Sequence, residues 1–190
     1  DCGAVLANFS RLLVDANREL DSPTLFRKEA EGRTVRLNEQ VEAAQSEGKR
    51  RLEAIYHPYH RHIDQRVAEL KEASLLSIHS FTPLYEGKKR SMELGVLFNR
   101  DPELAEHFAN ELKEEGFAVA LNEPYSGYEG VIYGVEQHAL KHDRDFLEVE
   151  VRQDLAVDPK SREAVVKALQ RASEATLSQD ARRARREQTL

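Results

Sequence analysis

The sequence has few of the residues that build cross-linked or metal-thiolate frameworks. It contains one cysteine (Cys2), one methionine and no tryptophan in 190 residues. A single cysteine excludes an internal disulfide and a zinc site built from several cysteines, and it fits the reducing cytoplasm, where we expect the protein to be located. No apolar run approaches transmembrane length and no signal peptide is visible, so a membrane is not an expected partner.

Acidic residues outnumber basic ones, with 34 Asp and Glu against 28 Lys and Arg. The formal net charge is −6, which disfavours a general role in binding nucleic acid. The exception is the tail of residues 178–190, with its Arg-rich segment Ala181–Glu187. We interpret this tail as a solvated helix end, although it could contact an acidic surface. Glycine motifs of the Walker or dinucleotide type are absent, so a nucleotide is not an expected cofactor.

The length of the chain suits one domain with a sizeable core, and we predict a single α/β domain over residues 1–190. The chain begins with Asp1 rather than methionine, and we expect that an upstream N-terminal strand is missing. Strand-like and helix-like segments alternate, which predicts a mixed, mainly parallel sheet flanked by helices. The predicted strands cover residues 9–14, 74–78, 94–98, 117–121 and 146–151.

Helical patterns fill most of the remaining chain. An apolar stripe predicts a helical stretch over residues 38–72, with either a kink or a junction of two helices at Pro58. Asp101 fits the N-cap of a helix that starts at Pro102 and ends near Gly116. Further helices are predicted over residues 134–142 and from Pro159 onward, whereas residues 21–37 form an irregular excursion.

His79 is the first candidate functional residue, because it follows the apolar strand over residues 74–78. In open α/β sheets, ligands bind beyond the carboxyl ends of the strands. A histidine there suits metal binding or proton transfer. We expect Ser80, which follows it directly, to contact the substrate. A histidine that is merely hydrogen-bonded at a strand end is the alternative.

Asn17 and Arg18 form the second candidate, just past the first predicted strand. A guanidinium fork beside an amide donor suits the carboxylate of a substrate. A structural ion pair between Arg18 and Asp15 is the alternative.

The last predicted strand carries charge on one face. Glu148, Glu150 and Arg152 alternate with apolar residues, and a parallel strand is normally apolar on both faces. The pattern indicates either a polar cleft or an edge strand that uses charge to block further pairing.

The other histidines give weaker signals. His57 and His60 lie one turn apart near Pro58, and we interpret them as helix-surface residues. His138 and His142 have the spacing of a zinc pair, but the acid of a His-Glu-x-x-His motif is missing.

Six segments of the chain together resemble the N-formylglutamate amidohydrolase family, in unchanged order from the first predicted strand to Leu155. They are Phe9–Arg18, Tyr56–His60, Ser77–Pro83, Gly95–Asp101, Asn122–Gly127 and Glu148–Leu155. The resemblance implies a fold similar to zinc carboxypeptidases. It also implies metal-dependent hydrolysis of the amide bond of a small N-acyl amino acid, such as N-formylglutamate, with zinc as the cofactor.

The resemblance also implies roles for individual residues. His79 resembles the late histidine ligand of the zinc, and Glu150 resembles the general base. Asn17 and Arg18 look like the pair that holds the substrate carboxylate. Further residues implied to line the same pocket are Tyr125, Ser126 and Arg152.

The chain departs from the family pattern in its metal ligands. In the family, an upstream strand carries a histidine motif that supplies the other ligands, and only His79 has a match here. The chain is therefore either part of an active hydrolase or a catalytically inactive relative that binds carboxylate-bearing small molecules. A third interpretation is an interaction module that uses the long helix around Pro58 and the basic tail.

Overall fold

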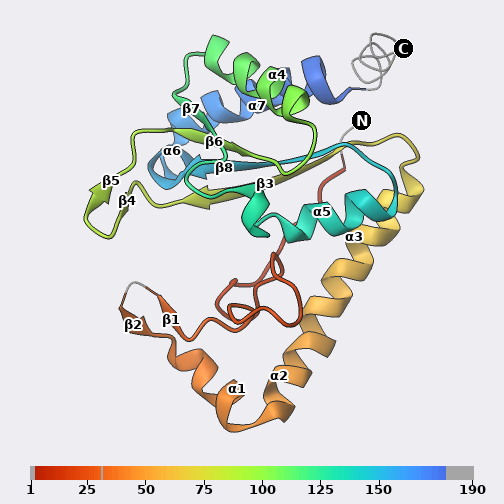
Figure 1. The fold of residues 1–190 in the computed structure, drawn as a ribbon, viewed down its shortest axis with the longest axis vertical. Coiled ribbons are helices and arrows are strands. Elements are labelled where there is room, and N and C mark those ends of the chain that lie inside the picture. The colour runs from red at the N-terminus through yellow and green to blue at the C-terminus, as the bar shows by residue number, and fades with distance from the viewer. Residues whose placement is uncertain (1–2, 31, 179–190) are drawn as a thin grey trace.

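A four-stranded mixed sheet forms the centre of the protein, as a computed structural model shows for residues 3–30 and 32–178 (Figure 1). Its strand order is β3-β8-β6-β7. The strands are β3 (Leu75–Phe81), β8 (Phe146–Arg152), β6 (Leu94–Leu97) and β7 (Val119–Leu121). β3 runs parallel to β8 and β6 parallel to β7, whereas β6 and β8 are antiparallel. The predicted mixed, mainly parallel sheet is confirmed; the basic tail from residue 179 lies outside the described residues.

The charged strand β8 is an interior strand. It pairs along its length with β3 on one side and with β6 on the other. Glu150 therefore lies between His79 and Gly95 in the ladder. The edge-strand alternative is wrong, and the two carboxylates need another explanation.

The two faces of the sheet are covered differently (Figure 1). Helices α4 (Pro102–Glu114) and α7 (Pro159–Leu177) pack on one face, where Leu147, Val149 and Val151 join the main apolar core. Helix α5 (Tyr133–Lys141) packs on the other face against β3 and β8. Its core is smaller and contains Phe146 but neither carboxylate of β8.

Helix ends lie where their sequence signals predicted. The side chain of Asp101 accepts a hydrogen bond from the Leu104 N–H at 2.9 Å, and Pro102 is the first residue of α4. Gly116 follows α4 with a φ of +92°, a conformation that glycine adopts without steric cost. These caps fix the helices that cover the apolar face.

The N-terminal part of the chain lies below the sheet in Figure 1. The predicted strand over residues 9–14 is wrong, because this segment forms turns. Leu13 N–H donates to the Ser10 carbonyl at 2.9 Å, and Leu12 N–H lies 3.2 Å from the Ser10 hydroxyl oxygen. The hydroxyl competes with strand pairing by offering the backbone a local partner. The short elements that follow are β1 (Glu29–Ala30), β2 (Arg33–Thr34), η1 (Arg36–Asn38), α1 (Glu39–Ala43) and α2 (Gln45–Arg51).

Residues 38–72 do not form one helix, and the division falls at Ala44 rather than at Pro58. Ala44 is extended and separates α1 from α2. A π-helical turn, η2 (Leu52–Tyr56), then leads into α3 (His57–Glu69). Pro58 has no N–H to continue the regular ladder, and the His57 N–H bonds instead to the Leu52 carbonyl.

Three small elements complete the chain around the sheet. The strands β4 (Leu84–Tyr85) and β5 (Lys88–Lys89) form a hairpin that projects beyond the end of β3 (Figure 1). The others are η3 (Gly127–Glu129) and α6 (Gln153–Val157). Among the described residues, no helix combines the length and the apolar character needed to cross a bilayer.

Candidate functional site

Three potential metal ligands meet on the sheet face opposite α4 and α7. One ligand atom from each of His79, Glu148 and Glu150 lies within 4.8 Å of the others. The ladder explains this, because His79 pairs with Glu150 in register and Glu148 is two residues before Glu150 on the same face. His79 Nε2 is 3.5 Å from Glu148 Oε2. His79 lies within β3, which extends three residues beyond the predicted strand end.

The protein environment disfavours charge on all three groups. Burial, followed by repulsion from Glu150, raises the pKa of Glu148 to about 8. Burial also raises the pKa of Glu150 to about 7. Desolvation lowers the pKa of His79 to about 4, which keeps its imidazole neutral at physiological pH. Two buried carboxylates therefore lie side by side with a neutral imidazole.

This donor set fits a divalent cation. A neutral imidazole and carboxylate oxygens are ligands that zinc accepts. Glu150 is 6% exposed, and among the described residues its Oε2 has no hydrogen-bond partner. A buried carboxylate without a partner is costly, and a cation held by His79 and Glu148 would also offset the charge of Glu150 beside them.

Asn17 holds the cluster in place. Its side-chain nitrogen donates to the Val131 carbonyl at 2.7 Å and to Glu148 Oε2 at 3.1 Å, and it lies 3.5 Å from His79 Nε2. Its oxygen accepts the Gly134 N–H at the start of α5 at 2.7 Å. Asn17 was predicted to bind substrate, and that role stays a prediction; the visible contacts of Asn17 orient the acids.

Arg18 lies beside this cluster and is not ion-paired with Asp15. Asp15 is instead paired with Arg11, and its Oδ1 accepts the Asn17 N–H at 3.0 Å. Arg18 Nε donates to Thr24 and its Nη1 donates to the Asn17 carbonyl at 2.6 Å. These contacts anchor the guanidinium by one edge, and among the described residues Nη2 has no hydrogen bond.

Two predicted pocket residues lie elsewhere. Side chains alternate along β3, so Ser80 is on the face opposite His79 and is exposed. Arg152 shares the face of Glu150, but its guanidinium is held away by Asp154, with Nε 2.7 Å from Oδ1. Its Nη1 also donates to the Met92 carbonyl at 3.1 Å. The structure therefore does not bring Ser80 or Arg152 into the cluster.

Tyr125 and Ser126 lie in the loop between β7 and η3. The Tyr125 ring packs against the guanidinium of Arg90, with 5.3 Å between Arg90 Cζ and the ring centroid. Ser126 begins the turn of η3, where its carbonyl accepts the Glu129 N–H at 3.0 Å. Their predicted roles in substrate binding stay predictions.

Glu148 is the member of the cluster that sequence reasoning did not select. The alternation along the last strand already placed it on the same face as Glu150. That alternation was the signal that could have identified it, because two acids on one face of an interior strand must share an environment.

The histidines of the helices form a second, separate cluster. His60 was predicted to lie on a helix surface, and this is wrong: it is 8% exposed, and its Nδ1 lies 3.0 Å from His138 Nε2. The reason is that α5 packs on α3 at this turn. Asp64 is 2.8 Å from His142 Nε2 and 3.7 Å from His138 Nδ1. This network joins two helices, and among the described residues it does not form a three-ligand metal group.

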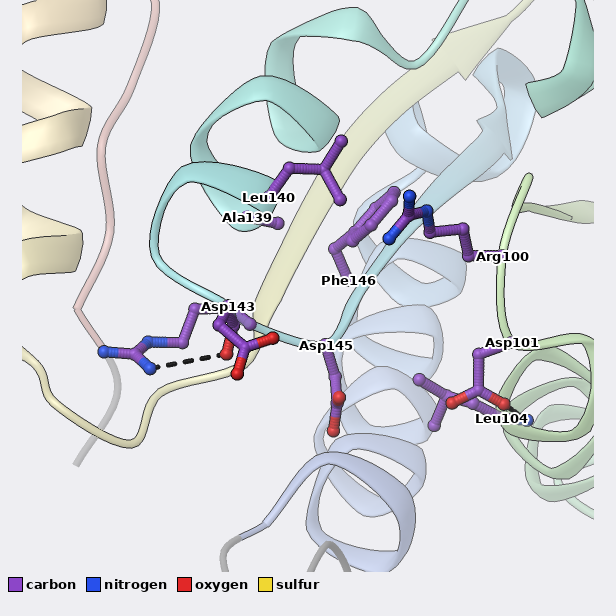
Figure 2. A pocket seen from close by; sticks show the side chains of 9 residues that line it. Arg100, Asp101, Leu104, Ala139, Leu140, Asp143, Asp145 and Phe146 are labelled. Carbon is purple, nitrogen blue, oxygen red and sulfur yellow. Dashed lines mark hydrogen bonds between the residues drawn. The ribbon is translucent and has the colours of Figure 1, made fainter.

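A separate pocket of about 210 Å³ opens at the beginning of β8, beside Phe146 (Figure 2). Arg100 and Asp101 line it from the start of α4, and Ala139 and Leu140 line it from α5 (Figure 2). It lies at the opposite end of β8 from Glu150, so it is not part of the histidine–carboxylate site.

Comparisons with known proteins agree with this fold. A family model described as N-formylglutamate amidohydrolase matches residues 1–157. The crystal structure of gene product Atu2144 from Agrobacterium tumefaciens is similar at 28% identity and a TM-score of 0.78, over 88% of this chain and 68% of that one. N-formylglutamate amidohydrolase from Ralstonia eutropha JMP134 shares the fold at 19% identity and a TM-score of 0.57, over 93% and 74%. No curated protein matches the chain.

Proposed function

Because the match extends over residues 1–157, the chain belongs to the N-formylglutamate amidohydrolase family, and we propose that it hydrolyses the amide bond of an N-acyl amino acid such as N-formylglutamate in a metal-dependent reaction. The observation that carries this proposal is the convergence of His79, Glu148 and Glu150 on one sheet face. Hydrolysis of an amide needs a polarised carbonyl, an activated water and a proton for the leaving amine.

His79 and Glu148 are the residues that would hold the metal. His79 is kept neutral, so its lone pair is available, and Asn17 orients the Glu148 carboxylate toward it. When bound, a zinc ion would polarise the scissile carbonyl and lower the pKa of water. Asn17 would then fix the orientation of Glu148 as a ligand of the metal.

Glu150 would act as the general base. Its Oε2 is free of hydrogen bonds among the described residues, and burial raises the pKa of this carboxyl above its ordinary value in the metal-free site. A carboxylate in this place could accept the proton of the attacking water at Oε2 and then transfer it to the nitrogen of the leaving amine. One carboxylate serves both transfers, because the proton that it takes from the water is the proton that the leaving amine needs.

Arg18 would hold the α-carboxylate of the substrate. Its guanidinium is fixed by Thr24 and by the Asn17 carbonyl, close to the ligand Glu148. A fixed guanidinium positions the substrate so that its amide carbon meets the activated water.

Metal content and hydrolysis test the proposal together. We expect the purified protein to bind about one zinc per chain and to release formate from N-formylglutamate, with both properties lost on chelation. His79→Ala should lose both, whereas Glu163→Gln on the exposed surface of α7 should keep both. Full hydrolysis in the presence of a strong chelator would overturn the metal-dependent mechanism.

A binding protein without hydrolytic activity is the second candidate. It is favoured by one observation, namely that the cluster contains a single imidazole among the described residues. This candidate predicts binding of N-acyl amino acids without release of formate at any zinc concentration. Formate release that depends on Glu150 would eliminate it.

A further inference from the structure

Arg90 is a cation that the proposed mechanism does not use. It follows β5 directly and is half-buried. Its guanidinium carbon lies 5.5 Å from the ring centroid of Phe81, 5.0 Å from that of Tyr85 and 5.3 Å from that of Tyr125. Aromatic faces attract a guanidinium and fix its plane, so the three rings hold Arg90 in a defined place.

The polar edge of Arg90 is almost unused. Within the described part of the chain, no carboxylate forms an ion pair with it. Its one side-chain hydrogen bond runs from Nη1 to the Thr82 carbonyl at a long 3.4 Å. A guanidinium whose flat face packs on rings still presents its N–H groups along the edge, in the fork that matches a carboxylate. The aromatic contacts therefore hold an arginine most of whose donors have no hydrogen-bond partner among the residues that the structure describes.

The backbone brings this arginine to the edge of the histidine–carboxylate site. Phe81 lies two residues after His79 on the same face of β3, which corresponds to roughly 7 Å along the strand. Arg90 packs on Phe81, and His79 pairs in register with Glu150, so Arg90 is held near the proposed base. Among the described residues no hydrogen bond joins Arg90 to Glu150.

Gly95 allows the third ring to reach this place. A Cβ at position 95 would lie 2.1 Å from the Glu123 carbonyl oxygen, so only glycine lets the loop cross β6 there. Gly95 is the ladder partner of Glu150, and the crossing loop carries Tyr125. The loop that packs on Arg90 is therefore seated directly beside the proposed base.

Arg90 and Arg18 reach the cluster from different segments of the chain. Arg18 and Asn17 approach from the end of the site where Glu148 lies, and both donate to the Val131 carbonyl. Arg90 approaches from the carboxyl end of β3, beyond His79. A substrate whose formamide lies at His79 and Glu150 could extend one carboxylate toward each guanidinium.

We propose that Arg90 binds the side-chain carboxylate of the substrate and so selects acidic amino acids, while Arg18 binds the α-carboxylate. The proposal rests on the proposed function, because it takes an N-acyl amino acid as the ligand. In N-formylglutamate, two carboxylate arms and the formamide diverge from one carbon atom. Two separated guanidinium groups flanking the hydrolytic centre match that arrangement.

Binding to metal-free protein tests the proposal without turnover. Calorimetric titration of the chelator-treated protein would compare N-formylglutamate with N-formylglutamine, which has the same shape but a neutral side chain. We expect the wild type to prefer the glutamate ligand by roughly ten- to a hundredfold, the range for a charged hydrogen bond. Arg90→Met should bring the two affinities within about twofold of each other, and Arg90→Lys should give an intermediate preference.

Lys89→Met is the matched control, because it removes a neighbouring exposed cation of the same hairpin. It should keep the wild-type preference, and melting curves should show that all variants fold. An unchanged preference in Arg90→Met, or no preference in the wild type, would overturn the proposal. A normal binding preference without any metal-dependent hydrolysis would instead refute the proposed function and leave the role of Arg90 intact.

Discussion

The seven residues of strand β8 present apolar side chains on one face of the sheet and mainly charged side chains on the other. Leu147 and Val149 are fully buried against α4 and α7. Glu148 and Glu150, their neighbours in sequence, are also almost fully buried, but on the face with His79. Burial is thus nearly equal on both faces, and only the side chains differ. The apolar face stabilises the fold, whereas the buried acids of the other face lower its stability and form the proposed site.

The cost of the acidic face is visible in its unsatisfied groups. Burial raises the pKa of both carboxylates, and Glu150 Oε2 has no partner among the described residues. Burying an apolar side chain of similar size would instead stabilise the fold by about 2 kcal/mol. Such local conflict with folding is expected at functional sites. The contrast predicts that mutations on the two faces have separable effects.

Glu150→Gln should have the largest effect on the acidic face. The amide keeps the shape of the side chain but cannot accept a proton, so we expect kcat/KM to fall by roughly a thousandfold, within the usual range for a general base. Stability should not fall, because a neutral side chain replaces a buried acid. Formate release and thermal melting measure the two effects. Activity within tenfold of the wild type would exclude Glu150 as the base.

Leu147→Ala should give the reciprocal result on the apolar face. Leu147 has 0% exposure in the main core, and its truncation should lower the free energy of unfolding by about 2–5 kcal/mol. Below its melting temperature, the variant should keep the KM of the wild type and its zinc content. Urea denaturation and steady-state kinetics would check this. A loss of zinc in the folded variant would show that the two faces are not independent.

Glu148→Gln should change how stability depends on pH in the metal-free protein. The pKa of Glu148 is about 8 in the folded state, against 4.5 for an ordinary glutamate. Between these values the folded state retains a proton that the unfolded state has released, so stability falls as the pH rises through this window. The amide removes that loss, which is on the order of a few kcal/mol.

Urea denaturation with chelator present, at pH 5 and pH 8, would measure this change. The loss of stability from pH 5 to pH 8 should be smaller in Glu148→Gln than in the wild type, and Glu163→Gln should behave as the wild type does. An equal pH dependence in all three proteins would mean that Glu148 is not protonated in the fold.

The sequence predicted the apolar face and its helices well, because those signals are local. Asp101 and Gly116 mark the ends of α4 by their own side chains and backbone preferences. The predicted strand over residues 9–14 failed for a related reason: its apolar residues resemble a strand, but the Ser10 hydroxyl stabilises a turn there. The apolar character of a short segment alone cannot distinguish a strand from a turn.

The acidic face was only partly predictable, because its geometry depends on pairing between distant strands. His79 and Glu150 could be named, and the register between β3 and β8 places them side by side. The face on which Ser80 lies could not be predicted without knowing that β3 continues to Phe81. Arg152 illustrates another limit, since its partner Asp154 is only two residues away and turns its side chain from the site. The ring contacts of Arg90 come from separate loops and left no pattern in the sequence.

Asp101→Ala should have the smallest effect and should sharpen the comparison most finely. The Asp101 carboxylate caps α4, which covers only the apolar face, and the residue has a φ of +43° that alanine tolerates poorly. Loss of the cap should lower the free energy of unfolding by about 1 kcal/mol, or about 2–4 °C in melting temperature. Asp101→Asn keeps a capping oxygen and tolerates this backbone conformation, so it should melt close to the wild type.

Neither variant should alter zinc affinity, because α4 contacts β6 and β7 rather than His79 or its acidic partners. A change in zinc affinity in Asp101→Ala but not in Asp101→Asn would show that the helix layer on the apolar face transmits strain through the sheet to the acidic face, and the separation of the two faces would then fail.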